Sequence, residues 1–199
     1  MGRATSLETC TASGILEGSL NNVAMRHQNF HIDVLDKKPV KGGMIMVLNK
    51  KHLELLKKGG ATTWNTWRRS HPATVPELHG ADLSEVDLSE YNLSMANLRE
   101  ANLYNAKLSA SDLIEANLNG ANLANADLSG AKLIEAKLEF CDLKGANLAN
   151  ADLTGADLSG ANLMTANLGG ANLNYARLTD AIISEEQLST VKSRLEGTL

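Results

Sequence analysis

Residues 121–140 read ANLANADLSGAKLIEAKLEF, and the pattern in this stretch decides the fold of the chain. A leucine stands at every fifth position, and a small residue, usually alanine, stands two positions before each leucine. The pattern runs from Ala81 to Asp180 without insertion, so that Leu83 to Leu178 define 20 consecutive five-residue units. A period of five matches neither the 3.6-residue period of an amphipathic helix nor the two-residue period of a strand. The stretch therefore predicts a repeat architecture.

The leucines of the repeat are the predicted core. A chain that buries one leucine and one small residue in every five must wind around its own axis, with these two side chains inside. Burying each leucine stabilises the fold by about 2 kcal/mol before entropy is subtracted. Cys141 stands at a small-residue position and is therefore predicted to be a buried thiol. The leucines that represent this core are Leu83, Leu103, Leu123, Leu143 and Leu163.

The charged residues that precede the leucines predict the number of units in one turn, which we call a coil. Successive coils lie about 4.8 Å apart, and like charges stacked directly on each other are destabilising. Five units per coil would stack Lys107 on Lys132, and three units per coil would stack four aspartates in one column. Four units per coil instead give columns of alternating sign, such as Asp112, Lys132 and Asp152. We therefore predict four units per coil, about five coils and a height of roughly 24 Å.

The repeated Ala-Asp/Asn-Leu pattern, as in Ala121-Asn122-Leu123 and Ala151-Asp152-Leu153, resembles that of the pentapeptide repeat proteins. The resemblance covers Ala81 to Asp180, about half of the chain. It implies a right-handed, four-sided β-helix, and the handedness rests on the resemblance alone. The expected fold class is thus all-β, a quadrilateral β-helix with short helices capping both ends.

Four segments are predicted along the chain. Residues 1–45 form a poorly ordered N-terminal extension, because they show no sustained periodicity. Residues 46–75 form a helical N-terminal cap that Gly59-Gly60 interrupts and Pro72 ends. Residues 76–183 form the β-helix. Residues 184–199 form a C-terminal capping helix, since Ser184 and Gln187 have the spacing of a capping box.

The caps are expected to cover the exposed ends of the β-helix with apolar side chains. At the N-terminal end, Trp64 and Trp67 lie three residues apart and can meet Tyr91, which is too bulky for the interior of later coils. At the C-terminal end, one apolar stripe is formed by Leu188, Val191 and Leu195. The resemblance also implies a homodimer contact at that end, as in some relatives.

No catalytic, cofactor or metal site is predicted. The five histidines all precede the β-helix, and none has zinc-ligand spacing with cysteines or carboxylates. The recurring glycines occupy corners of the repeat and do not form a phosphate loop. No small-molecule substrate is therefore expected. The absence of a long apolar run predicts no membrane span, and the lack of a secretory signal predicts a cytoplasmic protein.

Charge is distributed unevenly along the chain, and this distribution bears on the kind of partner that is expected. Residues 81–180 carry 14 acidic and 6 basic side chains, a net charge of −8, whereas residues 1–80 carry a net charge of +5. The best-known activity of the resembled family is binding of DNA gyrase by an acidic rod that mimics duplex DNA. Duplex DNA of the same height would carry about 14 charges, and lysines or arginines interrupt every side of the β-helix. Gyrase binding is therefore an alternative and not the favoured function.

Two further surfaces are candidates. Ile114 and Glu115 recur as Ile134 and Glu135 four units later, which predicts an outward apolar ridge beside paired carboxylates for a basic partner segment. Four basic pairs before the β-helix suggest nucleic-acid binding, although solvated helix faces explain them equally well: Lys37-Lys38, Lys50-Lys51, Lys57-Lys58 and Arg68-Arg69. The favoured function is a non-enzymatic scaffold that presents a rigid acidic surface to an unidentified protein.

Overall fold

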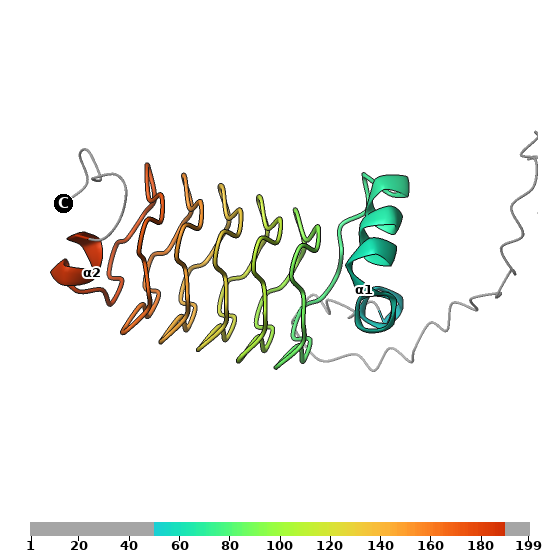
Figure 1. The fold of residues 1–199 in the computed structure, drawn as a ribbon, viewed down its shortest axis with the longest axis horizontal. Helices are drawn as coiled ribbons and strands as arrows, with labels where there is room; N and C mark the ends of the chain where they lie inside the picture. The colour runs from blue at the N-terminus through green and yellow to red at the C-terminus, as the bar shows by residue number, and fades with distance from the viewer. Residues whose placement is uncertain (1–49, 190–199) are drawn as a thin grey trace, which may run out of the picture. The chain divides into compact units, whose positions relative to one another are not determined.

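The computed structural model describes residues 50–189, in which two helices flank a long run of isolated parallel β-bridges. Helix α1 spans Lys50–Ser70 and helix α2 spans Glu185–Ser189. Figure 1 shows the intervening chain as a stack of similar coils. The extension predicted for residues 1–45 lies outside the described residues, as do Val191 and Leu195 of the predicted C-terminal cap. Neither described helix has the length and apolar character needed to cross a membrane.

The β-bridges determine how many units make one coil. Each bridge joins two residues that lie four units apart, from Glu77–Asn97 at the start to Asn162–Ile182 at the end. Four five-residue units therefore complete one coil, which confirms the prediction from the alternating charges. One of the alternating columns includes a direct ion pair, in which Lys107 Nζ lies 4.0 Å from Asp87 Oδ2.

Backbone hydrogen bonds tie each coil to the coils on both sides of it. The N–H of Leu123 donates to the carbonyl of Asp142 in the next coil at 2.7 Å, and the N–H of Asn122 donates to that of Ala101 in the preceding coil at 3.0 Å. The corner is closed within the unit, where the N–H of Ala126 donates to the carbonyl of Leu123 at 3.0 Å. Because these bonds recur from coil to coil, the buried backbone is satisfied without long strands.

The Asn or Asp before each leucine has two roles that explain its recurrence. In the unit of Asp127, the carboxylate Oδ1 accepts the N–H of Ser129 at 3.1 Å, the local bond by which these side chains stabilise turns. The same oxygen accepts the side-chain amide of Asn147 in the next coil at 2.9 Å. An Asn or Asp therefore closes its own turn and links two coils.

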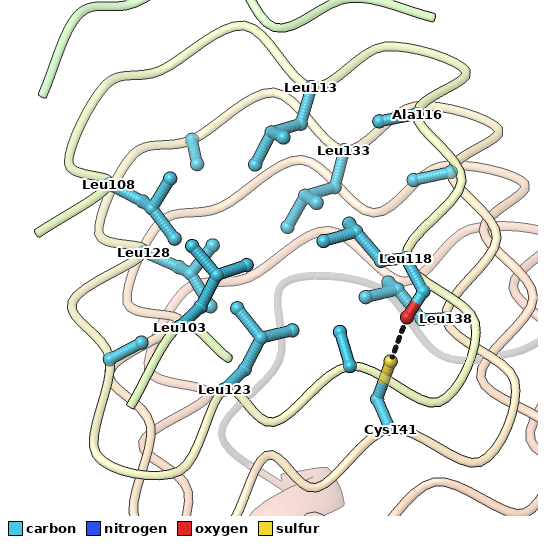
Figure 2. Packing of buried hydrophobic residues seen from close by; sticks show 14 of the residues in the cluster. Leu103, Leu108, Leu113, Ala116, Leu118, Leu123, Leu128, Leu133, Leu138 and Cys141 are labelled. Carbon is cyan, nitrogen blue, oxygen red and sulfur yellow. Dashed lines mark hydrogen bonds between the residues drawn. The ribbon is translucent and has the colours of Figure 1, made fainter. Parts of the chain in front are cut away.

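The core is a set of stacked leucines with small residues between them. Figure 2 shows leucines of successive coils lying above one another, as Leu103 and Leu123 do. All five leucines named for the predicted core have 0% exposure: Leu83, Leu103, Leu123, Leu143 and Leu163. Leu78 is also fully buried, so the core begins one unit before Ala81.

Cys141 takes the place of an inward alanine and is 1% exposed. Its S–H donates to the carbonyl of Leu118 at 2.9 Å (Figure 2), and burial raises the pKa of the thiol to about 12. Because the thiolate is the reactive form, we expect Cys141 in a Cys10→Ser variant to resist Ellman's reagent in the native protein and to react fully in denaturant. Stoichiometric labelling without denaturant would contradict this prediction.

Helix α1 consists of two helical segments that meet at Gly60, as Gly59-Gly60 predicted. Gly60 has φ 63° and ψ 170°, a conformation outside the helical region that glycine adopts without steric cost. The second segment packs on the first coil through Trp64, whose Nε1–H donates to the carbonyl of Asn92 at 2.6 Å. Trp64 is 0% exposed, and its ring centroid lies 5.1 Å from that of Trp67 and 6.3 Å from that of Tyr91.

Arg68 corrects one interpretation of the sequence. It belongs to the basic pair Arg68-Arg69, for which the sequence suggests part of a nucleic-acid surface or of a solvated helix face. Both interpretations require an exposed side chain, but Arg68 is only 6% exposed. Its guanidinium donates to the carbonyls of Thr74 at 2.6 Å and Ser94 at 2.9 Å. Arg68 thus fastens α1 to the first coil, while Arg69 stays exposed.

His52 of α1 makes the packing of this helix sensitive to pH. Its Nδ1 accepts the N–H of Glu77 at 3.1 Å, and burial is the main cause that lowers its pKa below the ordinary value of 6.5. The folded protein therefore binds fewer protons than the unfolded chain just below pH 6.5, so the free energy of unfolding falls as the pH drops. We expect His52→Gln to lose part of this dependence in denaturant titrations at pH 7.5 and 5.5. An unchanged dependence in His52→Gln, or an equal loss in the exposed His71→Gln control, would contradict this role.

Helix α2 begins with the predicted capping box. The N–H of Gln187 donates to Ser184 Oγ at 3.1 Å, and the N–H of Ser184 donates to Gln187 Oε1 at 3.0 Å. The amide nitrogen of Gln187 also donates to the carbonyls of Leu163 and Ala166 at 2.7 and 2.9 Å. One side chain therefore caps the helix and binds backbone acceptors of the last coil, while Leu188 packs partly buried against the core.

Candidate functional site

A hollow lies on the side of the β-helix whose outward residues run from Glu77 through Asn97, Asn117, Lys137 and Asp157 to Arg177. We call this side the hollow face. The hollow has a volume of about 490 Å³, and it extends over several coils from Arg99 to Arg177. Short residues such as Asn119 and Gly155 line it between these longer side chains, which accounts for its shape.

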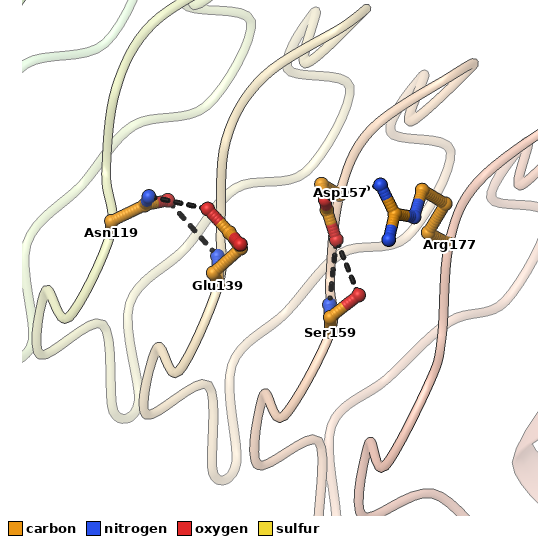
Figure 3. A network of polar contacts seen from close by, with 5 residues as sticks. All are labelled: Asn119, Glu139, Asp157, Ser159 and Arg177. Atoms are coloured by element: carbon orange, nitrogen blue, oxygen red, sulfur yellow. Dashed lines mark hydrogen bonds and ion pairs between the residues drawn. The ribbon is translucent and has the colours of Figure 1, made fainter.

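The carboxylates on this face are largely engaged by neighbouring groups (Figure 3). Glu139 Oε2 accepts the side-chain amide of Asn119 at 2.6 Å, and the N–H of Glu139 donates to Asn119 Oδ1 at 3.1 Å. Asp157 Oδ1 accepts the hydroxyl of Ser159 at 2.6 Å and its N–H at 3.0 Å, while Asp157 Oδ2 lies 3.4 Å from Arg177 Nη1. Burial raises the pKa of Asp157, but the Ser159 bonds and the Arg177 charge outweigh it, so the pKa lies below its ordinary value.

The cations of the hollow are less engaged than its carboxylates. Within residues 50–189, Arg99 and Lys137 form no ion pair, although both line the hollow and both are exposed. Cations in this state bind carboxylate or phosphate groups through charge-assisted hydrogen bonds. The face can therefore accept an anionic group from outside.

Two exposed aromatic residues lie at the corners on either side of the hollow face. Phe140 follows the lining residue Glu139 and is 74% exposed, and Tyr175 comes two residues before Arg177 and is 85% exposed. Phe140 has φ 57°, and its ring lies over the corner of the next coil, where a Cβ on Gly160 would come within 2.6 Å of ring carbons. Gly160 is thus the residue that permits this placement of the ring.

The ridge predicted from the repeated Ile-Glu pair lies mostly outside the hollow. Ile114 and Ile134 are half-buried, while Glu115 and Glu135 are exposed at corners with φ 56° and 54°. The N–H of Glu115 donates to the carbonyl of Ile134 at 2.9 Å, so the two units do stack. Of these four residues only Glu135 lines the hollow. The role of the ridge in binding stays a prediction.

Sequence reasoning missed the hollow because its residues come from different positions of the repeat. Lys137 precedes a leucine, Arg99 follows one, and Glu135 stands at a corner, so no single column of the repeat contains them all. A two-dimensional plot of all outward positions, with four units in each row, would have placed them together. In the described part of the chain, no group of three or more His, Cys, Asp or Glu side chains could hold a metal ion.

Comparisons with known proteins point to one family. The family described as pentapeptide repeats (8 copies) matches the chain three times, over residues 77–113, 111–148 and 146–184, which together span more than half of the chain. No curated protein matches the chain.

Solved structures of pentapeptide repeat proteins are among those similar to the chain. A pentapeptide repeat protein from the Arabidopsis thaliana thylakoid lumen is 29% identical over 57% of this chain and 72% of that chain, with a TM-score of 0.40. Rfr23 from the cyanobacterium Cyanothece 51142 is 39% identical over 50% of this chain and 61% of that chain, with a TM-score of 0.32. QnrB1, a plasmid-mediated fluoroquinolone resistance protein, is 24% identical over 61% of this chain and 76% of that chain, with a TM-score of 0.35.

Proposed function

Because this chain belongs to the pentapeptide repeat proteins, which are right-handed quadrilateral β-helices, we propose that it is a non-enzymatic scaffold that binds another protein through the hollow face. In this proposal the rod has about five coils with a capping helix at each end. The rod serves as a rigid support, since its backbone is bonded from coil to coil throughout residues 77–182.

The observation that carries the proposal is a combination of two features of the hollow face. Arg99 and Lys137 form no ion pair within residues 50–189, and the exposed rings of Phe140 and Tyr175 lie at the two corners of this face. Arginine, tyrosine and phenylalanine are enriched in protein interfaces, and aromatic anchors commonly supply most of the binding energy. The partner that fits presents a carboxylate or phosphate to Arg99 and Lys137, and apolar side chains to Phe140 and Tyr175. Glu135 on the rim disfavours a partner that is acidic throughout.

Affinity capture with matched variants tests the proposal. The binding variant is Phe140→Ser/Tyr175→Ser, and the control variant is Tyr104→Ser/Met164→Ser, which removes two exposed apolar side chains from another side. We expect the true partner to be retained by the native protein and the control but lost from the binding variant, and to be weakened by Lys137→Glu. If every captured protein binds all variants equally, the hollow face is not the binding surface.

The alternative function is gyrase binding by DNA mimicry, and a supercoiling assay distinguishes it from the proposed scaffold function. A DNA mimic needs a continuous acidic strip. Here Lys107, Lys132 and Lys137 are exposed, and the backbone of each forms a β-bridge with an aspartate one coil away. Basic side chains therefore interrupt the columns of acidic ones. We therefore expect no inhibition of gyrase-catalysed supercoiling at micromolar protein. Inhibition that Lys107→Glu/Lys132→Glu strengthens would favour the mimic over the scaffold.

A further inference from the structure

The first segment of α1 carries a basic surface that the proposed scaffold function does not use. Its four lysines, Lys50, Lys51, Lys57 and Lys58, are all exposed, and we call them the lysine arc. At 100° per residue, these lysines and the exposed Glu54 occupy an arc of about 120° around the helix axis. The buried residues His52 and Leu56 lie on the opposite side of the same segment.

Contacts with the first coil fix the direction of the lysine arc. The hydroxyl of Tyr91 donates to the carbonyl of Leu56 at 3.2 Å, and the N–H of Glu77 donates to Nδ1 of His52 at 3.1 Å. Both contacts are made by the side of the segment that faces the β-helix. The lysine arc therefore lies on the side of the segment opposite these contacts, with Lys57 at its edge close enough to act on Asp82 of the first coil. A ligand meets the arc on a helix that is already folded and anchored.

The charges around the lysine arc favour a polyanion at this end of the molecule. Glu54 is the single acidic residue of α1, so the arc keeps a net charge of +3. The acidic β-helix, with its net charge of −8, extends from the other side of α1. Lys57 acts on Asp82 of the first coil, whose pKa is lowered mainly by hydrogen bonds from Ser84 and to a lesser degree by Lys57.

The composition of the lysine arc favours nucleic acid over a lipid surface as its ligand. A helix that lies in a membrane interface inserts an apolar face beside its basic one. The apolar side of α1 instead packs on the β-helix, and none of the large exposed hydrophobic residues found in residues 50–189 belongs to α1. A purely basic surface of this kind fits phosphates that lie at regular spacing in water.

We propose that the lysine arc binds the phosphates of double-stranded nucleic acid without sequence preference. The two lysine pairs lie seven residues apart, which is about 10 Å along the helix axis. Duplex DNA presents one charge per about 1.7 Å of its axis, so phosphates are available to both pairs in any register. Lysine acts as a point charge and reads no base edge here, because the arc contains no planar or amide side chain that pairs with bases.

Salt-dependent binding of the full chain to a labelled 20-base-pair duplex tests the proposal. Each phosphate that is neutralised contributes about −0.9 to the slope of log K against log salt concentration, so the arc contributes about −3.6. Between 50 and 200 mM salt this contribution corresponds to a loss of affinity of about 150-fold. We expect Lys50→Gln/Lys51→Gln to make the slope shallower by about 1.8, since two phosphate contacts are lost.

The matched control is Lys132→Gln/Lys144→Gln, which removes the same charge from exposed positions of the β-helix. The control should keep the native slope, and both variants should keep the native melting temperature because all four replaced side chains are exposed. If the two double variants change the slope equally, or if neither changes it, the proposal is wrong. Binding to mixed phosphatidylcholine and phosphatidylserine vesicles that is lost in Lys50→Gln/Lys51→Gln, without binding to the duplex, would overturn it in favour of a membrane surface.

Discussion

Replacing Leu123 with alanine should lower the free energy of unfolding by about 3 kcal/mol. Leu123 is 0% exposed and stacks on Leu103 of the preceding coil (Figure 2). The backbone on both sides of it is held by bonds of 2.7 to 3.0 Å to two other coils, so the coils cannot close around the space that the side chain leaves. The loss therefore includes the cost of a cavity in addition to the lost burial.

Urea titration of Leu123→Ala measures this loss, and Met164→Ala is its matched control. Both substitutions remove three heavy atoms, but Met164 is 45% exposed and points outward. The control should stay within about 0.5 kcal/mol of the native protein. Equal losses in the two variants would mean that inward leucines are not the main source of stability.

Replacing Trp64 with alanine should cost about 4 kcal/mol, because it removes a fully buried ring. The substitution also removes the Nε1–H that binds the carbonyl of Asn92 at 2.6 Å, an acceptor at the open edge of the first coil. Trp64 thus joins α1 to the core of the first coil by both packing and a hydrogen bond.

Two variants separate the contributions of Trp64. Trp64→Phe retains an aromatic ring but loses the hydrogen bond, so it should recover more than half of the stability lost in Trp64→Ala. Trp67→Ala removes a half-buried ring that lies against His52 at 4.8 Å, and it should cost less than Trp64→Ala. Thermal unfolding followed by near-ultraviolet circular dichroism gives all three values. A larger loss in Trp67→Ala than in Trp64→Ala would contradict the assignment of Trp64 as the main contact.

Features that depend on one period could be predicted from the sequence. The four-unit coil follows from charges that must not stack on like charges, and the β-bridges confirm it. The break at Gly60 and the capping box of Ser184 and Gln187 follow from local rules, and the structure contains both. The last two predictions succeed because each depends on residues that are close in the chain, and the first succeeds because one fixed period places every charged position of the repeat.

Features that depend on side-chain direction could not be predicted in the same way. Arg68 and Arg69 are neighbouring arginines, yet Arg68 is buried against two carbonyls and Arg69 is exposed. The rotation of the helix about its axis relative to the first coil determines which of the two side chains is buried. The placement of Phe140 depends on Gly160 in the next coil, a contact between corners that neither residue signals alone. The hollow likewise arises from the differing side-chain lengths of residues in several coils.

The strict spacing of the repeat also determines how the rod can change during evolution. Inserting or duplicating four consecutive units lengthens it by one full turn and leaves every surface aligned. Deleting a single unit, such as residues 126–130, preserves the leucine core but rotates everything beyond it by a quarter turn. Arg99 would then lie on a different wall from Lys137 and Arg177, and the hollow would be divided without any loss of burial. The deletion would, however, stack Lys107 directly on Lys132, which is destabilising, so both charge pairing and selection for binding preserve the register between the two halves of the rod.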